Sequence, residues 1–338
     1  MTGDPLKHQR AVFARRRALR WMTLSGSVLV PSGVQAQGAT AYPNKPIRLV
    51  VGYPPGGSGD FITRVAADEL ARELGVQIVV ENRAGAGGTM ANEQVSKSAA
   101  DGYTVLNAGP FALTQALYRK LSYDGNRDFI PVSRLAVGPM IICVNLDLPV
   151  RNLQDLIAHA KANPGKLNIA SSGNGSTPHL AGALFETVAG VQMVTVQFKG
   201  GGPAASSTIA GDTHVMFATP PTVINFIKAG RLRALALTTA EPSAAIPGIP
   251  GAARAGLPGY DTSFSFGLYM PVSTPEPIVR RFHEAVLKAM TRPGVKERVA
   301  TQGMDVAIHQ SPELFADSLR NSADALEKLV RMSGARLE

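Results

Sequence analysis

The stretch that most constrains the fold runs from Ile47 to Leu74, where a short apolar strand passes through a glycine-rich loop into a helix. The loop, residues 53–60, carries two prolines and three glycines, and apolar residues at helical spacing follow it. We predict that Asp60 caps this helix. The open amides of the loop and the positive end of the helix dipole then meet at one point, which predicts an anion site there.

The same order of strand, loop and helix recurs along the chain. Strands that alternate with helices predict βαβ units, in which ligands collect at the carboxyl ends of parallel strands. We therefore predict an α/β fold with two lobes, each a mostly parallel sheet flanked by helices. The predicted strands are 47–51, 77–80, 103–106, 140–144, 167–170, 193–198, 214–217, 233–238 and 264–270, and the last two predicted helices are 275–290 and 312–332.

The first 36 residues are typical of an export signal. They contain a basic segment that ends at Arg20, a modest apolar stretch over 21–30 and a small-residue cleavage site at Ala36. Both the Sec and the twin-arginine export routes fit this sequence. We expect the signal to be cleaved near Ala36 and the mature chain to be exported.

The order of the predicted elements indicates that the chain crosses twice between the lobes. Lobe 1 is predicted to be discontinuous and to comprise residues 41–140 and 268–338, and lobe 2 comprises residues 141–267. The crossing strands, near 136–145 and 264–271, would form a hinge. Residues 241–260 are rich in Pro, Gly and Ala and predict irregular surface chain.

Composition and motifs argue against several functional classes. Residues 1–36 contribute +5 of the net charge of +9, and the remaining Lys and Arg are dispersed, so nucleic-acid binding is not expected. No apolar run long enough to span a membrane follows the signal. Cys143 is the only cysteine, which predicts a buried, inert thiol, and the histidines lack metal-ligand spacing. We predict neither a metal nor a cofactor, since residues 85–88 match the dinucleotide pattern only incompletely.

Signals for catalysis are weak. Ser58 and Ser176 lie in glycine-rich loops without the flanking residues of a nucleophile elbow, so a capping or hydrogen-bonding role is the simpler interpretation. His179 lies in the first turn of a predicted helix, where ligand contact and plain surface exposure are equally good interpretations. A capping role explains Asp60 more simply than a role as a general base.

Taken together, these residues resemble the periplasmic solute-binding proteins of tripartite tricarboxylate transporters, the TctC-like Bug receptors. The resemblance covers essentially the whole mature chain. Its motifs are Tyr42-Pro43-x-Lys45-Pro46-Ile47-Arg48, Pro54-Pro55-Gly56-Gly57-x-x-Asp60, Val80-Glu81-Asn82-Arg83-x-Gly85-Ala86-Gly87-Gly88, Asp101-Gly102-Tyr103-Thr104, Gly165-Lys166-Leu167-Asn168, Gly173-Asn174-Gly175-Ser176-x-x-His179-Leu180 and Lys199-Gly200.

The resemblance implies a two-lobed, hinge-closing periplasmic binding protein of the type II kind. It places the loops 54–60 and 173–176 on opposite sides of a carboxylate, which backbone amides, hydroxyls and bridging waters hold. Family members often carry an acidic residue where this chain has Ala218-Thr219, and a Tyr where it has Phe198. The candidate ligand-binding residues are Tyr53, Pro55, Gly56, Gly57, Ser58, Asp60, Gly87, Gly88, Ala108, Ser171, Gly173, Asn174, Gly175, Ser176, Thr177, His179, Lys199, Gly200 and Thr219.

The sequence thus predicts a monomeric receptor, not an enzyme, that captures a di- or tricarboxylate or a related acid. It would deliver this ligand to the membrane subunits of a tripartite tricarboxylate transporter. Two alternatives stay open at this point. One is an exported α/β hydrolase or transferase that uses Ser58, Ser176 or His179, and the other is a ligand sensor that docks on a membrane signalling protein.

Overall fold

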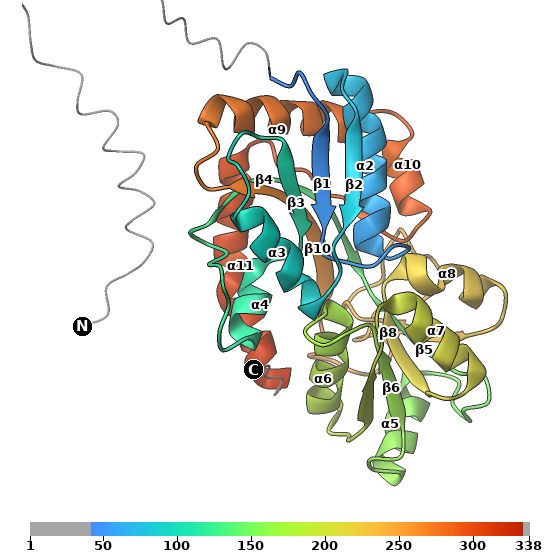
Figure 1. Ribbon diagram of the computed structural model, residues 1–338. Helices are drawn as coiled ribbons and strands as arrows, with labels where there is room; N and C mark the ends of the chain where they lie inside the picture. Colours follow the sequence, from blue (N-terminus) through green and yellow to red (C-terminus); the bar gives the residue numbers. More distant parts are fainter. Residues whose placement is uncertain (1–41, 334–338) are drawn as a thin grey trace, which may run out of the picture. The chain divides into compact units, whose positions relative to one another are not determined.

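The computed structural model describes residues 42–333, which contain two sheets flanked by helices (Figure 1). The export signal predicted for residues 1–36 lies outside this described part. Among residues 42–333 no helix combines the length and the apolar character that a membrane span requires.

The first sheet has six strands in the order β11-β4-β10-β3-β1-β2. Helices α2 and α9 pack on one of its faces, and α3, α4 and α11 pack on the other. Its strands are β1 (Ile47–Val51), β2 (Ile78–Asn82), β3 (Thr104–Ala108), β4 (Phe129–Pro139), β10 (Ser263–Pro271) and β11 (Asp305–Val306). Its helices are α2 (Ser58–Leu74), the short 3₁₀ helix η1 (Ala86–Gly88), α3 (Thr89–Ser96), α4 (Phe111–Leu117), α9 (Glu276–Met290), α10 (Val295–Ala300) and α11 (Pro312–Ser333).

The second sheet has five strands in the order β7-β6-β8-β5-β9. Helices α5 and α6 bury apolar residues on one face, and α7 and α8 on the other. The strands are β5 (Ile141–Val144), β6 (Asn168–Ser171), β7 (Val194–Gln197), β8 (Val215–Ala218) and β9 (Arg233–Leu237). The helices are α5 (Leu153–Ala162), α6 (Thr177–Ala189), α7 (Gly201–Ala210) and α8 (Pro220–Lys228).

The predicted two-lobed α/β fold is confirmed, but both sheets are mixed rather than mostly parallel. Strands β1, β2 and β3 pair in parallel, as do β6, β7 and β8. Every antiparallel pair between these strands includes β4, β5 or β10. In the first sheet β10 runs against its neighbours β3 and β4, and in the second sheet β5 runs against its neighbours β8 and β9.

The chain passes from the first sheet to the second at Met140, between β4 and β5, and β10 brings it back. As predicted, residues 241–260 contain no helix or extended strand, and a single bridge joins Leu237 to Gly251. The residue boundaries predicted for the two lobes, and a hinge at the crossing strands, stay predictions.

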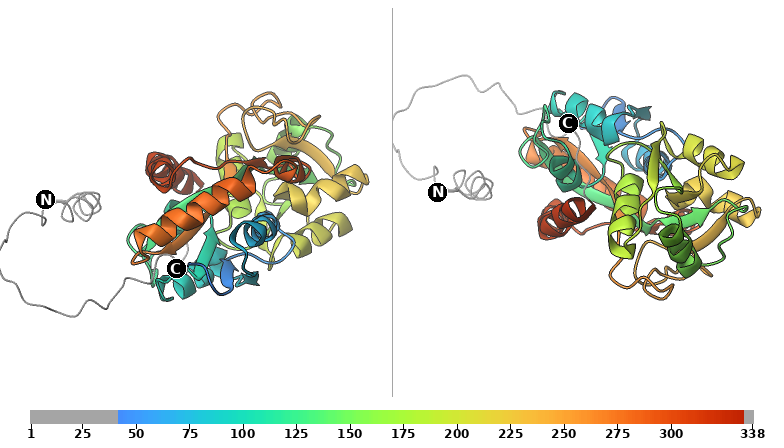
Figure 2. Two further views of the ribbon diagram at one scale, coloured as in Figure 1. Left: turned by 90° about the horizontal axis from the view of Figure 1, so that it is seen from above. Right: turned by 90° about the horizontal axis from the view of Figure 1, so that it is seen from below.

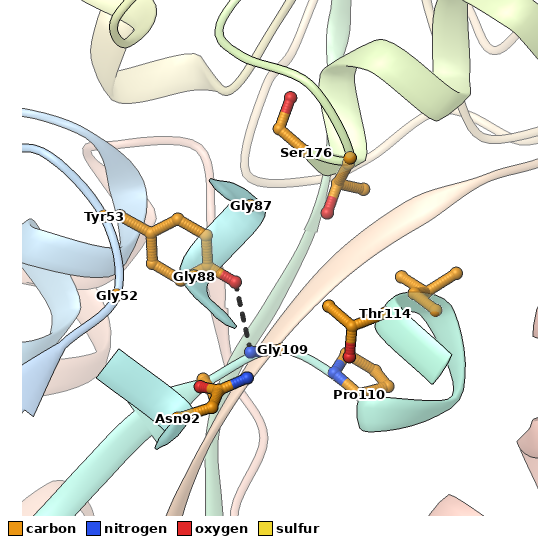
Figure 3. Close-up of a pocket in the computed structure, with 13 residues that line it drawn as sticks. Gly52, Tyr53, Gly87, Gly88, Asn92, Gly109, Pro110, Thr114 and Ser176 are labelled. Atoms are coloured by element: carbon orange, nitrogen blue, oxygen red, sulfur yellow. Dashed lines mark hydrogen bonds between the residues drawn. The ribbon is translucent and has the colours of Figure 1, made fainter. Parts of the chain in front are cut away.

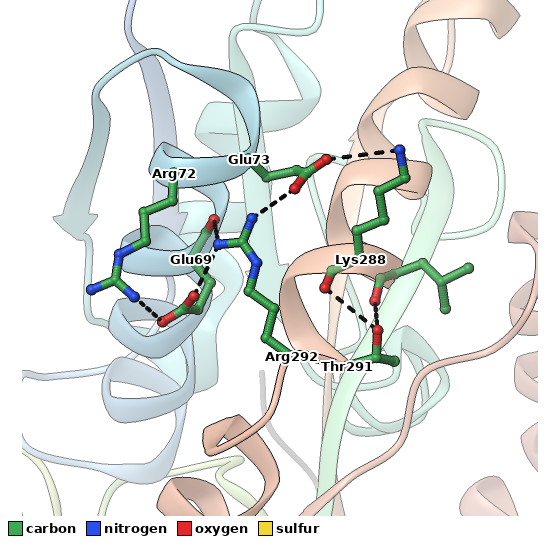
Figure 4. A network of polar contacts seen from close by, with 7 residues as sticks. Glu69, Arg72, Glu73, Lys288, Thr291 and Arg292 are labelled. Carbon is green, nitrogen blue, oxygen red and sulfur yellow. Dashed lines mark hydrogen bonds and ion pairs between the residues drawn. The ribbon is translucent and has the colours of Figure 1, made fainter.

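A polar network fixes α2 against α9 on the outer face of the first sheet (Figure 4). Arg292 donates to Glu69 at 3.2 Å and to Glu73 at 2.7 Å, and Lys288 lies 3.8 Å from the Glu73 carboxylate. Glu69 is only 6% exposed. Figure 2 shows the two helices side by side, so the C-terminal half of α2 is held against α9.

A small apolar cluster joins α4 of the first sheet to α6 of the second. Leu113 and Leu117 of α4 contact Leu180 of α6, and Val330 of α11 completes the cluster. The Thr187 hydroxyl of α6 also donates to the carbonyl oxygen of Met332 in α11. The beginning of α6 is therefore held beside α4, where the cavity described below lies.

Cys143 behaves as predicted. It is fully buried in β5, and burial raises the pKa of its thiol to about 12. Its Sγ lies 3.6 Å from the carbonyl oxygen of Met216 in the neighbouring strand β8. This thiol is protonated and packed in a core, as expected of a structural cysteine.

Candidate functional site

A cavity lies at the carboxyl ends of β1 and β3, against the first turn of α6 from the other sheet (Figure 3). None of its lining residues carries a charged side chain. The lining comprises Gly52, Tyr53, Gly87, Gly88, Asn92, Ala108, Gly109, Pro110, Leu113, Thr114, Gly175, Ser176 and Thr177. Most of these residues are small or carry amide or hydroxyl groups, so hydrogen bonds are the main polar interactions that the cavity can offer a ligand.

Tyr53 forms one wall of the cavity. Its ring packs edge-on against Phe266 at 5.4 Å, and its hydroxyl accepts a hydrogen bond from the Gly109 N–H at 3.2 Å. Burial raises the pKa of this phenol, so it stays protonated and can still donate its hydrogen. A Cβ at Gly59 would lie 2.7 Å from the ring, which explains why glycine follows Ser58 at the start of α2.

The turn before α3 brings the two lobes together. Residues 85–88 all have positive φ, and three of the four are glycines, which adopt this conformation without steric strain. A Cβ on Gly87 would lie 3.2 Å from the Asn174 carbonyl oxygen and 3.3 Å from Gly175 in the opposite lobe. Glycine at position 87 thus permits a close approach of the two lobes beside the cavity.

Asp60 does not cap α2 in the predicted way. Gly57 is the N-cap residue and Asp60 is the third residue of the helix. Its buried carboxylate accepts from the Gly56 N–H at 3.0 Å, from Asn82 Nδ2 at 2.9 Å and from the Arg64 guanidinium. Burial alone would raise the pKa of Asp60, but these hydrogen bonds together lower it. The carboxylate therefore fixes the shape of its own loop.

The loop 54–60 itself does not line the cavity. The N–H groups of Ser58, Gly59 and Asp60 have no hydrogen-bond partner among the described residues, as the first turn of a helix requires. The Ser58 hydroxyl is buried and also has no partner there. Pro54 packs instead against Gly200, where a Cβ would lie 2.9 Å from the proline ring.

The N-terminus of α6 forms the wall opposite Tyr53. Ser176 is the N-cap, in agreement with the capping role predicted for it: its Oγ accepts from the His179 N–H and donates to the Gly173 carbonyl at 2.7 Å. Thr177 is then the first helical residue, and Pro178 has no N–H to offer. Within residues 42–333 the Thr177 N–H has no partner, so this N–H and the Thr177 hydroxyl are the donors that α6 presents.

His179 is turned toward its own loop. Its Nδ1 accepts from the Gly175 N–H at 3.2 Å, and burial lowers the pKa of the imidazole. The ring is therefore neutral at pH 7 and supports Gly175, which lines the cavity. It contributes to the site by positioning a neighbour.

Nearby cations play little part in the cavity. Arg83 pairs with Glu81, and the exposed Lys199 has no ion pair among the described residues. Across residues 42–333 there is also no group of three His, Cys, Asp or Glu side chains that could hold a metal. The electrostatic attraction for an anion must come from N–H and O–H groups.

The structure divides the predicted site residues into two sets. The set that lines the cavity is Tyr53, Gly87, Gly88, Ala108, Gly175, Ser176 and Thr177. The set outside its lining is Pro55, Gly56, Gly57, Ser58, Asp60, Ser171, Gly173, Asn174, His179, Lys199, Gly200 and Thr219. In this second set, Ser171 contacts the Gly173 carbonyl at 3.5 Å and Thr219 contacts Thr222 at 3.1 Å, so both hydroxyls have partners within their own lobe.

Sequence reasoning missed several lining residues, among them Asn92 of α3 and both Leu113 and Thr114 of α4. Helix α4 has only seven residues and gave no recognisable periodicity, although Pro110 directly before an apolar run is a helix-start signal. Asn92 is one polar residue on the buried side of a short helix, and its partner, the Tyr123 hydroxyl, lies 31 residues away.

The model of the tripartite tricarboxylate transporter family receptor matches residues 62–330. This chain belongs to that receptor family. Among curated relatives, Protein BugT of Bordetella pertussis is 33% identical over 326 residues, covering 94% of this chain and 99% of BugT.

Solved structures agree with this family assignment. Rpa4515 of R. palustris with adipate has a TM-score of 0.84 and 31% identity, and covers 88% of the receptor and all of that chain (100%). MatC from Rhodopseudomonas palustris with bound malate has a TM-score of 0.80 and 29% identity, and covers 86% of the receptor and 100% of MatC. The family and these neighbours are solute-binding receptors, and the receptor shares their two-lobed fold.

Proposed function

We propose that this receptor captures a small organic acid, a di- or tricarboxylate, in the cavity between the two lobes. The observation that carries the proposal is that the strand-end loops of the first sheet and the first turn of α6 from the second sheet line one uncharged, hydrogen-bonding cavity. The adipate and malate complexes of the two Rhodopseudomonas neighbours support the choice of a carboxylic acid.

The chemistry of the cavity suits a carboxylate that is captured and released. Thr177 offers an N–H, a hydroxyl and the positive end of the α6 dipole, and Tyr53 offers a hydroxyl from the other wall. Hydrogen bonds to a charged acceptor are worth about 1.5–3 kcal/mol each. Four or five of them, less several kcal/mol lost on association, leave roughly −8 kcal/mol, which corresponds to micromolar affinity.

Ligand binding would select the arrangement in which both lobes contact the acid. A ligand shifts the equilibrium toward the closed state only if it binds that state more tightly than the open state. The additional contacts that it makes in the closed state supply this difference in affinity. The approach of Gly87 to Asn174 and Gly175 and of Gly200 to Pro54 supports this proposal, with these residues as the surfaces that would meet on closure. We infer that the closed receptor, a monomer exported to the periplasm, docks on the membrane subunits of its transporter.

Catalysis by the candidate serines fits the geometry less well. Ser176 donates its hydroxyl hydrogen to the Gly173 carbonyl, and His179 Nδ1 is occupied by the Gly175 N–H. Among the described residues no serine hydroxyl is hydrogen-bonded to a histidine ring, so the base that a serine nucleophile needs is lacking. The membership of the chain in a family of solute-binding receptors supports the inference that it acts as a binding protein rather than as an enzyme.

A thermal-melt screen of the processed protein against di- and tricarboxylates, amino acids, aromatic acids and nucleotides tests this function. We expect a melting shift with one group of carboxylates and none with nucleotides. No shift with any acid, after dialysis to remove carried-over ligand, contradicts the proposal. Loss of uptake of the same acid on gene deletion then distinguishes transport from a purely signalling output.

A further inference from the structure

We propose that Asn92 reads a hydroxyl group on the ligand, so that the receptor prefers a hydroxy acid over the same acid without its hydroxyl. This inference rests on the proposed function and names the substrate class of the same cavity. The two carboxylate-bound neighbours do not settle the question, because malate carries a hydroxyl and adipate does not.

Asn92 lies in the lining of the cavity with one end of its amide fixed. It is 3% exposed, and its Nδ2 donates to the Tyr123 hydroxyl at 2.8 Å. Tyr123 is itself buried, and burial raises the pKa of its phenol, so the partner stays a neutral hydroxyl. The amide therefore has one orientation in which Nδ2 is satisfied.

The other end of the amide is left without a partner. Asn92 Oδ1 is buried and accepts no hydrogen bond from the described residues. Leaving a buried acceptor unsatisfied is unfavourable by about 1–3 kcal/mol. Figure 3 shows Asn92 among the lining residues, with its amide nitrogen toward Gly109 and Thr114 and its oxygen on the other side. A molecule that enters the cavity and reaches this oxygen can supply the missing donor.

The donor on the ligand must be uncharged. None of the lining residues is acidic, and an ammonium group enclosed there would be buried without a counter-charge. A carboxylate oxygen cannot serve either, because it only accepts hydrogen bonds. A hydroxyl group donates without carrying charge, and Leu113, Pro110 and Ala108 provide apolar surface for the carbon chain that bears it.

The two walls thus have complementary roles. The α6 wall presents the Thr177 N–H and hydroxyl, which suit a carboxylate, and the α3 wall presents the Asn92 acceptor, which suits a hydroxyl. A site that hydrogen-bonds a substrate hydroxyl rejects the analogue that lacks it, because the analogue leaves the buried acceptor unpaired.

Titration calorimetry with matched pairs of acids tests the proposal. The pairs are malate and succinate, citrate and propane-1,2,3-tricarboxylate, and lactate and propionate. For the pair that the wild type binds, we expect the hydroxy acid to bind about tenfold more tightly or better. In Asn92→Ala this ratio should fall to about twofold or less, with the affinity for the plain acid nearly unchanged.

Two further variants control the experiment. Asn225→Ala makes the same substitution at an exposed position of α8 and should keep the wild-type ratio. Tyr123→Phe removes the hydroxyl that holds Nδ2 and should lower the ratio to an intermediate value. Melting curves of the ligand-free variants identify any that fail to fold.

Three results overturn the proposal: equal affinities within the bound pair, a preference that survives Asn92→Ala, or a wild-type ratio in Tyr123→Phe. A preference for the plain acid that Asn92→Ala abolishes also overturns it, because Nδ2 would then face a carboxylate. Binding of acids without a hydroxyl preference leaves the proposed function standing. Failure of every acid to bind the wild type refutes both.

Discussion

The loops before α2 and α6 look alike in the sequence but differ in what they offer a ligand. Each is rich in glycine and serine, and each leads from a parallel strand into a helix. The loop before α2 is fixed by the Asp60 carboxylate, which accepts the Gly56 N–H. The loop before α6 is capped by the neutral Ser176 hydroxyl. A negative charge lies in the first turn of α2, whereas the first turn of α6 has none.

This difference explains why the loop before α6 lines the cavity with donors and the loop before α2 shapes the lobe. An anion at the start of α2 would meet three free N–H groups and also the Asp60 carboxylate. At the start of α6 it meets fewer donors but no opposing charge. The charge in the first turn of each helix therefore distinguishes the two loops, whereas their glycine content does not.

The largest effect is expected for Gly87→Val, which places a side chain against the loop before α6. The backbone at Gly87 has φ +64°, and the added carbons would contact the Asn174 carbonyl. Strain and the blocked approach of the lobes, together about 3 kcal/mol, should weaken carboxylate binding about a hundredfold. Titration calorimetry measures the loss.

Gly57→Val is the matched control in the loop before α2. A Cβ there would have its nearest atom, the Pro54 carbonyl oxygen, at 3.8 Å, so the crowding that the glycine-rich sequence alone suggested does not arise. We expect affinity to change about twofold or less. If Gly57→Val removes binding and Gly87→Val does not, the roles assigned to the two loops are reversed.

Thr177→Val should have the second-largest effect. It keeps the shape of the side chain and removes the hydroxyl that faces the cavity, so a charged ligand loses one hydrogen bond of about 1.5–3 kcal/mol. Affinity should fall about tenfold or slightly more. Thr219→Val, whose native hydroxyl contacts Thr222 outside the cavity lining, is the control, and an equal loss in both variants would contradict the assignment.

Ser176→Ala should act mainly on stability, because Ser176 Oγ is the cap of α6. Loss of this cap should lower the free energy of unfolding by about 1 kcal/mol and the melting temperature by about 2–4 °C. Chemical denaturation without ligand measures the first value. An unchanged stability together with a large loss of affinity would make Ser176 a direct ligand contact.

Asp60→Asn tests whether the charge of Asp60 stabilises the loop before α2, because this contribution to stability depends on pH. The folded-state pKa of Asp60 lies below its ordinary value, so its charge stabilises the fold above that ordinary value, and the contribution is lost as pH falls through the folded pKa. Asp60→Asn should therefore be less stable than the wild type at pH 7, and the difference should shrink below about pH 4. A difference that does not depend on pH contradicts this account.

The smallest effect is expected from the titration of His179. Burial lowers the pKa of its ring, so the unfolded chain binds a proton more readily, and stability falls as pH drops below about 6.5. His179→Gln should reduce this slope of unfolding free energy between pH 7 and 5. An identical slope in the variant would show that other groups cause the pH dependence.

The sequence predicted the strand-loop-helix units well because glycines, prolines and apolar spacing act locally. The capping role of Ser176 was predicted correctly, whereas Asp60 was misplaced for a local reason, because it bonds back to the loop from the third position of its helix. Asn92 was not predictable, because its partner Tyr123 lies far along the chain and only the fold brings them together. Strands 140–144 and 264–270 were predicted, but their antiparallel pairing was not, because chain crossings leave no periodic signal.

The most direct test of the central claim is a thermal melt of the processed wild type and Gly87→Val, with and without the best carboxylate from the screen. At about a hundred times its dissociation constant a ligand adds roughly 2.7 kcal/mol, a shift of several degrees for a protein of this size. We predict that shift in the wild type and little or none in Gly87→Val, while Gly57→Val keeps it. Equal shifts in all three proteins would contradict a site enclosed between the two lobes beside Gly87.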